Sequence, residues 1–173
     1  ASVKESLDPS WLQFTFSDLW ERNAKSLGNR EAIVDSKTRL TWWEANQWIN
    51  QIAYGLIQLG LKKDDCIVVQ LPNCVELALL RIASERAGLI CMPISRALKG
   101  KEVEYILGKV KAKVFVARWK FRDVNYFDMI EEIRRSLPIE HVVMAGEEIP
   151  PGVIALNSFL AEKHDELTYE KAF

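Results

Sequence analysis

Short, nearly continuous apolar runs alternate along the chain with longer stretches in which apolar residues recur at helical spacing. Such runs, bounded by proline, glycine or polar turns, are typical of strands, and the run at residues 66–71 has the pattern of a parallel strand covered on both faces. They predict strands over residues 66–71, 89–92, 114–117 and 141–144. The stretches between them are long enough to be helical crossovers, so the alternation favours a largely parallel sheet wound by right-handed connections.

Residues suited to helix ends mark the predicted helices. Thr15 is expected to cap a helix that stops at Gly28, and Thr41 with Glu44 forms a capping box for a long helix that ends at Gly60. The other predicted helices are one capped by Asn73 and Glu76 and closed by Gly88, one over 102–107, one that starts at Asp123 and pairs Glu131 with Arg135, and a short capped one over 157–162.

Two further patterns complete the predicted fold. Residues 31–35 and 39–41 flank a short polar turn and predict a small hairpin. The helix from Val75 is apolar around most of its circumference, which indicates burial between two layers. We therefore expect an α/β fold with a mostly parallel sheet flanked by helices, part of a multilayered α/β sandwich, with a small N-terminal hairpin.

Charge and composition exclude several classes of partner. The chain has 173 residues, and its 23 lysines and arginines balance 24 aspartates and glutamates, so its overall charge does not favour nucleic acid or an anionic membrane. No run approaches eighteen apolar residues, and residues 1–6 show no export signal, so neither a membrane span nor secretion is expected.

The three cysteines are informative about the compartment. Cys66, Cys74 and Cys91 lie in apolar runs and lack the close cysteine or histidine neighbours of a zinc site. They are interpreted as buried free thiols in a reducing environment, which favours a cytoplasmic location.

Ligands of open parallel sheets bind outside the carboxyl ends of the strands, and the sequence supplies few reactive groups there. Asp64 and Asp65 precede their strand and are predicted to form a solvated turn at the opposite edge. The eight glycines are scattered, with a single one in 97–101, so no phosphate-binding loop is present. His141 and His164 have no nucleophile elbow nearby, so each is interpreted as structural or solvated. No catalytic, cofactor-binding or metal-binding residue is assigned.

Three groups of residues allow two interpretations each. Basic residues lie on both sides of one predicted strand. They either form a solvated edge of the sheet or attract a phosphate-bearing ligand. They are Lys109, Lys111, Lys113, Arg118, Lys120 and Arg122. Trp42, Trp43 and Trp48 either pack in the core or stack on an aromatic ligand. Residues 71–73 lie at the ligand-binding edge, although a strand stop and a helix cap already explain them.

Taken in order, several segments resemble the opening of the AMP-dependent synthetases, the adenylate-forming acyl-CoA and aryl-acid ligases. The resemblance spans about residues 12 to 145 and rests on order and spacing, not on one decisive motif. The similar segments are 14–19, 31–35, 40–44, 55–60, 63–69, 71–73, 87–93, 102–107 and 112–116.

The resemblance implies a two-step reaction. ATP and a carboxylate give an acyl-adenylate and pyrophosphate with the help of Mg²⁺, and a thiol such as coenzyme A (CoA) then takes the acyl group. The family's phosphate loop, its later motifs and its small C-terminal domain are missing from this sequence. Residues 1–173 are therefore expected to be an N-terminal fragment of the large domain, a scaffold that is inactive alone and binds no cofactor tightly.

The partners implied are the remainder of the same chain, a small carboxylic acid and CoA. Because the missing remainder would cover apolar surface, the fragment is also expected to dimerise or to associate through that exposed surface. One alternative stays open at this point, namely a stand-alone, non-enzymatic α/β binding module.

Overall fold

The computed structural model of the chain describes residues 14–122 and 124–173. Its helices and strands are, in chain order, α1 (Phe16–Leu27), β1 (Glu31–Val34), β2 (Arg39–Thr41), α2 (Trp42–Gln58), β3 (Cys66–Gln70), α3 (Val75–Arg86), β4 (Ile90–Pro93), α4 (Gly100–Lys109), β5 (Val114–Arg118), β6 (Lys120–Phe121), β7 (Val124–Asn125), α5 (Tyr126–Ile133), β8 (His141–Ala145), β9 (Ile154–Ala155), α6 (Leu156–Ala161) and α7 (Glu166–Ala172). The expectation that residues 1–6 hold no export signal concerns residues outside this description, and so does Asp123 itself.

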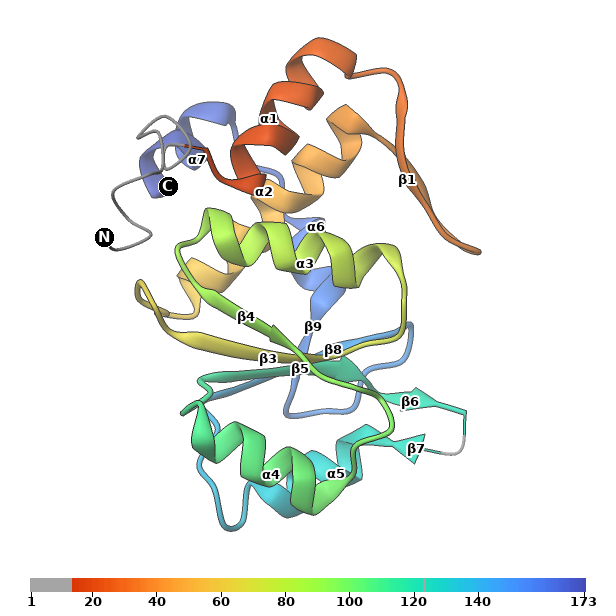
Figure 1. The fold of residues 1–173 in the computed structure, drawn as a ribbon, viewed down its shortest axis with the longest axis vertical. Helices are drawn as coiled ribbons and strands as arrows, with labels where there is room; N and C mark the ends of the chain where they lie inside the picture. Colours follow the sequence, from red (N-terminus) through yellow and green to blue (C-terminus); the bar gives the residue numbers. More distant parts are fainter. Residues whose placement is uncertain (1–13, 123) are drawn as a thin grey trace, which may run out of the picture.

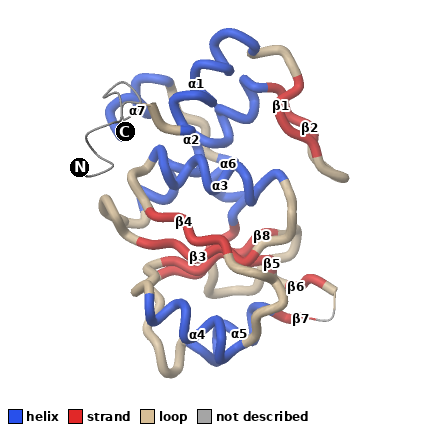
Figure 2. Tube along the Cα trace, in the orientation of Figure 1, coloured by secondary structure: helices blue, strands red, loops and turns tan. Residues whose placement is uncertain are grey.

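A five-stranded parallel sheet forms the centre of the fold, with the strand order β4-β3-β5-β8-β9 (Figures 1 and 2). The four predicted strands are confirmed with small shifts at their ends. The short edge strand β9 was not predicted, because two residues are too few to show a period. The predicted hairpin is also confirmed, since β1 and β2 pair antiparallel.

Helices cover both faces of the sheet, as the apolar strands predicted. On one face, Ile67 and Val69 pack in a core with α2, α3 and α6, and on the other face Val68 and Phe115 pack against α4 and α5. In Figure 1, α3 lies between the sheet and the pair α1 and α2. The molecule is therefore an α/β structure with more than one helical layer on one face of its sheet.

Helix α3 is buried on two sides, which confirms the interpretation of its apolar circumference. Val75, Leu79, Leu80 and Ala83 are essentially inaccessible to solvent, and the helix contacts α1, α2 and β4. Burial of this kind contributes about 1.5–3 kcal/mol for each large apolar side chain relative to exposure.

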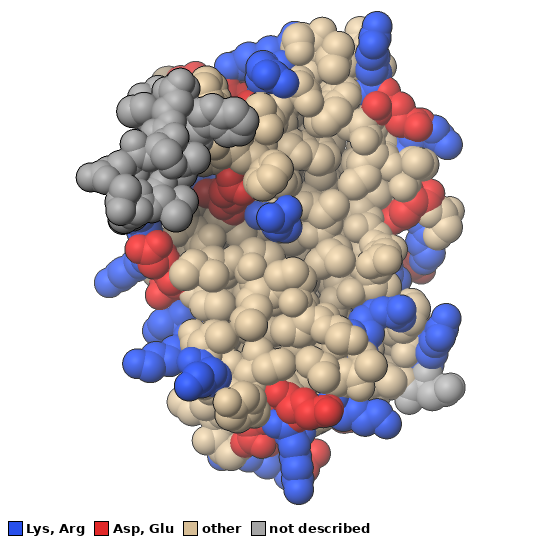
Figure 3. All heavy atoms as spheres, viewed as in Figure 1, with Lys and Arg blue, Asp and Glu red and all other residues tan. Residues whose placement is uncertain are grey.

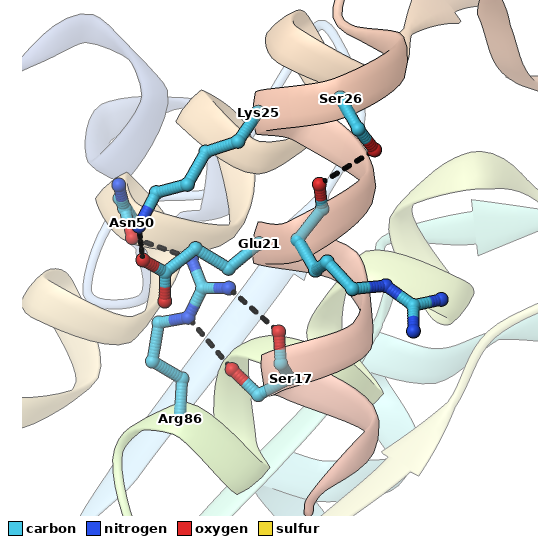
Figure 4. A network of polar contacts seen from close by, with 7 residues as sticks. Ser17, Glu21, Lys25, Ser26, Asn50 and Arg86 are labelled. Carbon is cyan, nitrogen blue, oxygen red and sulfur yellow. Dashed lines mark hydrogen bonds and ion pairs between the residues drawn. The ribbon is translucent and has the colours of Figure 1, made fainter.

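The C-terminal end of α3 also ties α1 to α2 through polar contacts (Figure 4). Glu85 Oε1 accepts a hydrogen bond of 2.7 Å from the Phe16 amide at the start of α1. Arg86 donates from Nε to Ser17 Oγ at 2.8 Å and from Nη1 to Asn50 Oδ1 at 2.5 Å. These bonds fix the two outer helices on α3.

Local helix signals in the sequence were largely correct. Thr15 caps α1, and Thr41 and Glu44 form the expected capping box at the start of α2. Gly60 has a φ of +84° and Gly88 a φ of +71°, the left-handed conformation expected where a helix is terminated by glycine. The cap predicted for α3 was wrong, because the helix begins at Val75 and its N-cap residue is Cys74 instead of Asn73.

Three helix starts, caps or ion pairs differ from the prediction by one or a few residues, and one helix was not predicted. The helix predicted from Asp123 begins at Tyr126, because residues 124–125 pair with residues 120–121 and Asn125 caps the helix. Arg134, not Arg135, pairs with Glu131 at 2.9 Å. Helix α6 starts one residue early and has no side-chain cap. The polar tail forms α7, which was not predicted.

The edge strand β4 exposes apolar side chains. Ile90 is 52% exposed and Met92 is 36% exposed, although both lie in a sheet strand. Figure 3 shows a broad area over α3 and β4 in which charged side chains are few. An unpaired sheet edge with apolar side chains is a site of association between chains.

Self-association of the chain is expected to decrease when this edge carries charge. Ile90→Lys places an ammonium group on the apolar surface, so light scattering at high protein concentration should show less dimer or aggregate than for the unaltered chain. Tyr105→Lys, on the exposed surface of α4, is the matched control. Equal scattering by all three proteins, or a strictly monomeric unaltered chain, would contradict this role of β4.

Within the described part of the chain, no helix is both long enough and apolar enough to span a bilayer.

Candidate functional site

The carboxyl ends of β3, β5 and β8 meet at one edge of the sheet, where a parallel α/β fold binds its ligands. A cleft of about 510 Å³ opens at this edge. Its walls come from the β1–β2 turn, α2, the start of α3, the ends of β5 and β8, and α6; among the lining residues are Lys37, Trp48, Glu76, Arg118, Trp119 and Lys120. We call this cavity the rim cleft.

Asp35 brings the N-terminal hairpin to the rim cleft. Its Oδ2 accepts a 2.9 Å hydrogen bond from the Val75 amide, and its Oδ1 accepts bonds of 2.8 Å from the amides of Lys37 and Thr38. The Val75 amide lowers the pKa of the Asp35 carboxyl most, followed by the amides of Lys37 and Thr38, with a smaller contribution from the charge of Arg118. The carboxylate thus takes the capping role predicted for Asn73 and holds the turn of the hairpin beside the cleft.

Two residues that line the rim cleft each carry a buried polar atom without a hydrogen-bond partner. Glu76 Oε2 and Arg118 Nε are inaccessible to solvent, and neither forms a hydrogen bond within the described residues. Because buried polar groups are normally paired, such atoms mark a place where water, a ligand or further polypeptide binds. The wall of the cleft therefore contains one acceptor and one donor that have no hydrogen-bond partner within the described residues.

Basic and aromatic side chains gather next to the rim cleft. The guanidinium carbon of Arg96 lies 4.6 Å from the centroid of the Phe121 ring, and that of Arg122 lies 5.5 Å from the same centroid. Lys120 Nζ lies 4.8 Å from the centroid of Trp119. We call Arg96, Trp119, Lys120, Phe121 and Arg122 the basic rim. Guanidinium and ammonium groups on aromatic rings are suited to bind phosphate groups.

The structure divides the basic cluster that the sequence predicted. Arg118, Lys120 and Arg122 belong to the ligand-binding edge, whereas Lys109, Lys111 and Lys113 lie at the amino end of β5. Lys113 forms an ion pair with Glu140 there, and that contact raises its pKa. Arg96 was missed, because it follows β4 and is distant from the cluster in sequence.

The tryptophans do not share one role. The ring centroid of Trp42 lies 4.9 Å from that of Trp20, and Trp48 is half-buried against the core and lines the rim cleft. Trp43 is 57% exposed, so of the two interpretations core packing is wrong for this residue.

The remaining candidates have structural surroundings. Asp65 accepts a 2.8 Å hydrogen bond from the Lys62 amide in the turn before β3, and Asp64 adopts a left-handed φ of 69°, so both lie at the edge opposite the cleft as predicted. His141 Nε2 lies 3.1 Å from the Leu59 carbonyl oxygen, and the His164 ring packs on Tyr54 at 4.4 Å between centroids.

The glycines and cysteines also follow the local structure. Helix α1 ends at Gly28 in a right-handed conformation, and residues 71–73 form the turn between β3 and α3. Cys66 is buried, as predicted, whereas Cys74 and Cys91 are partly buried, and all three are free thiols. Among the described residues, no three histidine, cysteine or acidic side chains converge as a metal site.

A larger cavity, of about 630 Å³, lies between α1, α2, α3 and α7. Its polar lining includes Ser17, Asn50 and Arg86, and Arg86 donates hydrogen bonds to the other two, which hold the helices together. The rim cleft is the better candidate, because it lies at the carboxyl ends of the strands, where a parallel sheet binds its ligands.

Comparison with known proteins identifies the family. The family described as AMP-binding enzyme matches residues 20–168. Human mitochondrial medium-chain acyl-CoA ligase ACSF2 is 27% identical over 179 aligned residues, which cover 92% of this chain and 29% of the human protein. The medium-chain fatty-acid–CoA ligase of Escherichia coli K12 is 22% identical over 85% of this chain and 26% of its own length.

Solved structures agree with this result. The anthranilate CoA ligase AuaEII in complex with anthranoyl-AMP superimposes with a TM-score of 0.80 and 26% identity, over 90% of this chain and 30% of that one. The chain thus spans between about a quarter and a third of the length of these proteins. The chain belongs to the AMP-binding enzyme family.

Proposed function

We propose that residues 1–173 form the N-terminal part of the large domain of an adenylate-forming acyl or aryl ligase. The whole enzyme would join a carboxylate to ATP, release pyrophosphate, and pass the acyl group from the adenylate to a thiol such as CoA. The family match over residues 20–168 supports this proposal, and so do the acyl-CoA ligases among its relatives. The proposed contribution of this part is a scaffold of sheet and helices, together with one binding edge.

The observation that carries the proposal is the basic rim at the carboxyl ends of the strands. Arg96, Lys120 and Arg122 lie on aromatic rings next to the rim cleft, where a parallel sheet binds its ligand. CoA carries several phosphate groups, which cationic side chains bind through charge-assisted hydrogen bonds. The basic rim is therefore proposed to attract and orient the phosphates of the coenzyme.

ATP and Mg²⁺ do not fit the described residues in the same way. The glycines with positive φ, Gly60, Gly88, Gly146 and Gly152, lie in separate turns and form no continuous phosphate cradle. The acidic side chains of the described part form no group of three that could coordinate a cation. No step of adenylation is therefore assigned to this part, and ATP and Mg²⁺ are proposed to bind a phosphate loop and a C-terminal domain outside this sequence.

Binding of CoA tests the role of the basic rim. In calorimetric titrations, Lys120→Ala and Arg122→Ala are each expected to weaken CoA binding about fivefold, because each removes one charge-assisted contact. Lys109→Ala, in the basic group at the other end of β5, should leave the affinity unchanged. The same affinity in all four proteins would reject the proposed site.

A turnover assay tests whether this part of the enzyme is inactive by itself, as proposed. The 173-residue chain, mixed with ATP, Mg²⁺, CoA and a panel of carboxylic acids, is expected to release no pyrophosphate above a blank. Sustained pyrophosphate release would show that the chain contains a complete active site, contrary to the proposal.

A cytoplasmic location of the whole enzyme belongs to the same proposal. The three free thiols support a reducing compartment. Fractionation of cells that produce the native protein would test it, and recovery of the protein in an organelle fraction would contradict it.

A further inference from the structure

Gln70, the last residue of β3, is an unusual polar side chain in the core. It is 1% exposed, and its Nε2 donates hydrogen bonds of 2.9 Å to the Ser95 carbonyl and 3.0 Å to the Leu98 carbonyl. Its Oε1 is buried and accepts no hydrogen bond within the described residues. The orientation of the amide is fixed, because rotating it by 180° would place Oε1 against two carbonyl oxygens.

The loop that Gln70 binds is held from a second side by Tyr126. The Tyr126 hydroxyl donates a 3.4 Å hydrogen bond to the Arg96 carbonyl, and its ring is almost fully buried. Two buried side chains, one from β3 and one from α5, thus hold the carbonyls of residues 95, 96 and 98. The backbone around Arg96 is held by these buried side chains, while the Arg96 side chain is exposed at the surface.

This fixed loop places Arg96 in the basic rim. The guanidinium groups of Arg96 and Arg122 contact the same Phe121 ring. Arg122 has a left-handed φ of 54°, which is strained for a residue other than glycine. Two guanidinium groups at one ring offer several donors for charge-assisted hydrogen bonds to a single anion. The arrangement is therefore suited to a phosphate group.

We propose that Gln70 is a positioning residue for coenzyme binding. By holding residues 95–98, it keeps the Arg96 guanidinium at the Phe121 ring, where Arg96 and Arg122 together bind a phosphate group of CoA. The inference rests on the proposed function, because it assigns a role to Gln70 at the same basic rim.

A matched pair of glutamines provides the test. Gln51 is also buried, and its Nε2 also donates to two carbonyls, those of Leu160 at 3.0 Å and Glu162 at 3.1 Å, but these lie near α6, away from the basic rim. Gln70→Leu is expected to weaken CoA binding about fivefold, since one charge-assisted contact is lost. Gln51→Leu should leave the affinity for CoA unchanged, although both variants lose two hydrogen bonds.

A double-mutant cycle separates positioning from general destabilisation. If Gln70 acts through Arg96, Gln70→Leu should weaken CoA binding no further in an Arg96→Ala background, and should have its full effect in a Lys120→Ala background. Hydrogen exchange of the Ala97 and Leu98 amides should accelerate in Gln70→Leu and not in Gln51→Leu. Tyr126→Phe, which removes only a hydroxyl, should weaken CoA binding in the same direction and serves where Gln70→Leu does not fold.

The outcomes distinguish this inference from the proposed function. If Arg96→Ala weakens CoA binding while Gln70→Leu behaves like Gln51→Leu, the positioning role is rejected and the coenzyme site stands. If substitutions at Arg96, Lys120 and Arg122 all leave CoA binding unchanged, the coenzyme site is rejected and the positioning role with it.

Discussion

Replacing Leu80 with alanine is expected to lower the free energy of unfolding by about 3–5 kcal/mol. Leu80 is fully buried in α3, between the sheet and the outer helices. The substitution removes apolar contacts in the core and leaves a cavity that the surrounding side chains cannot fill without moving. Because domains of this size are stable by only about 5–15 kcal/mol, the loss is a large share of the total.

Urea denaturation followed by tryptophan fluorescence measures this loss, since the chain has six tryptophans. Leu77→Ala is the matched control, because Leu77 lies on the same helix but is only partly buried. Its loss should be less than half that of Leu80→Ala. Equal losses for the two variants would show that α3 is not enclosed between two layers.

The sequence predicted best those features that depend on neighbouring residues. The capping box of Thr41 and Glu44 requires residues three positions apart, and it is present in the structure as predicted. The continuous apolar runs likewise identified strands covered on both faces, because β3 has no exposed residue. Both signals are complete within a few residues and need no knowledge of the tertiary structure.

Contacts between distant segments were beyond these local signals. The amide at the start of α3 bonds to Asp35, forty residues earlier, so the nearby Asn73 was wrongly chosen as its cap. A spacing of forty residues has no periodic signature. The strand pair β6–β7, with two residues in each strand, was missed for a related reason, and the start of α5 was placed too early as a result.

The basic rim shows the same limit at the candidate site. Lys113 and Lys120 are close in sequence, but one precedes and the other follows the five-residue strand β5. A strand of that length spans about 16 Å. Arg96 joins Arg122 only through the parallel arrangement of the strands. One signal could have identified Arg96, since it closely follows a predicted strand and so lies at a carboxyl end.

Cys74 and Cys91 are expected to react with alkylating agents at pH 8 about a hundredfold more slowly in the folded chain than in the urea-unfolded chain, since burial raises the pKa of each thiol from 9.0 to about 11. The thiolate is the nucleophile, and two pKa units reduce its fraction by two orders of magnitude. Mass spectrometry after timed alkylation can follow each site separately. Modification of Cys91 at the same rate in both states would contradict the expectation.

The same pKa shift makes the folded chain sensitive to alkali. A thiol whose pKa is higher in the folded state binds its proton more tightly there, so its contribution to stability is fully present below about pH 9 and is lost as the pH rises toward 11. The urea midpoint should therefore fall between pH 9 and pH 11, and should fall less in the double variant Cys74→Ala with Cys91→Ala. Lysines and tyrosines titrate in the same range, so only the difference between the two proteins gives the contribution of the thiols to stability. Identical pH profiles would show that burial does not hold these thiols protonated.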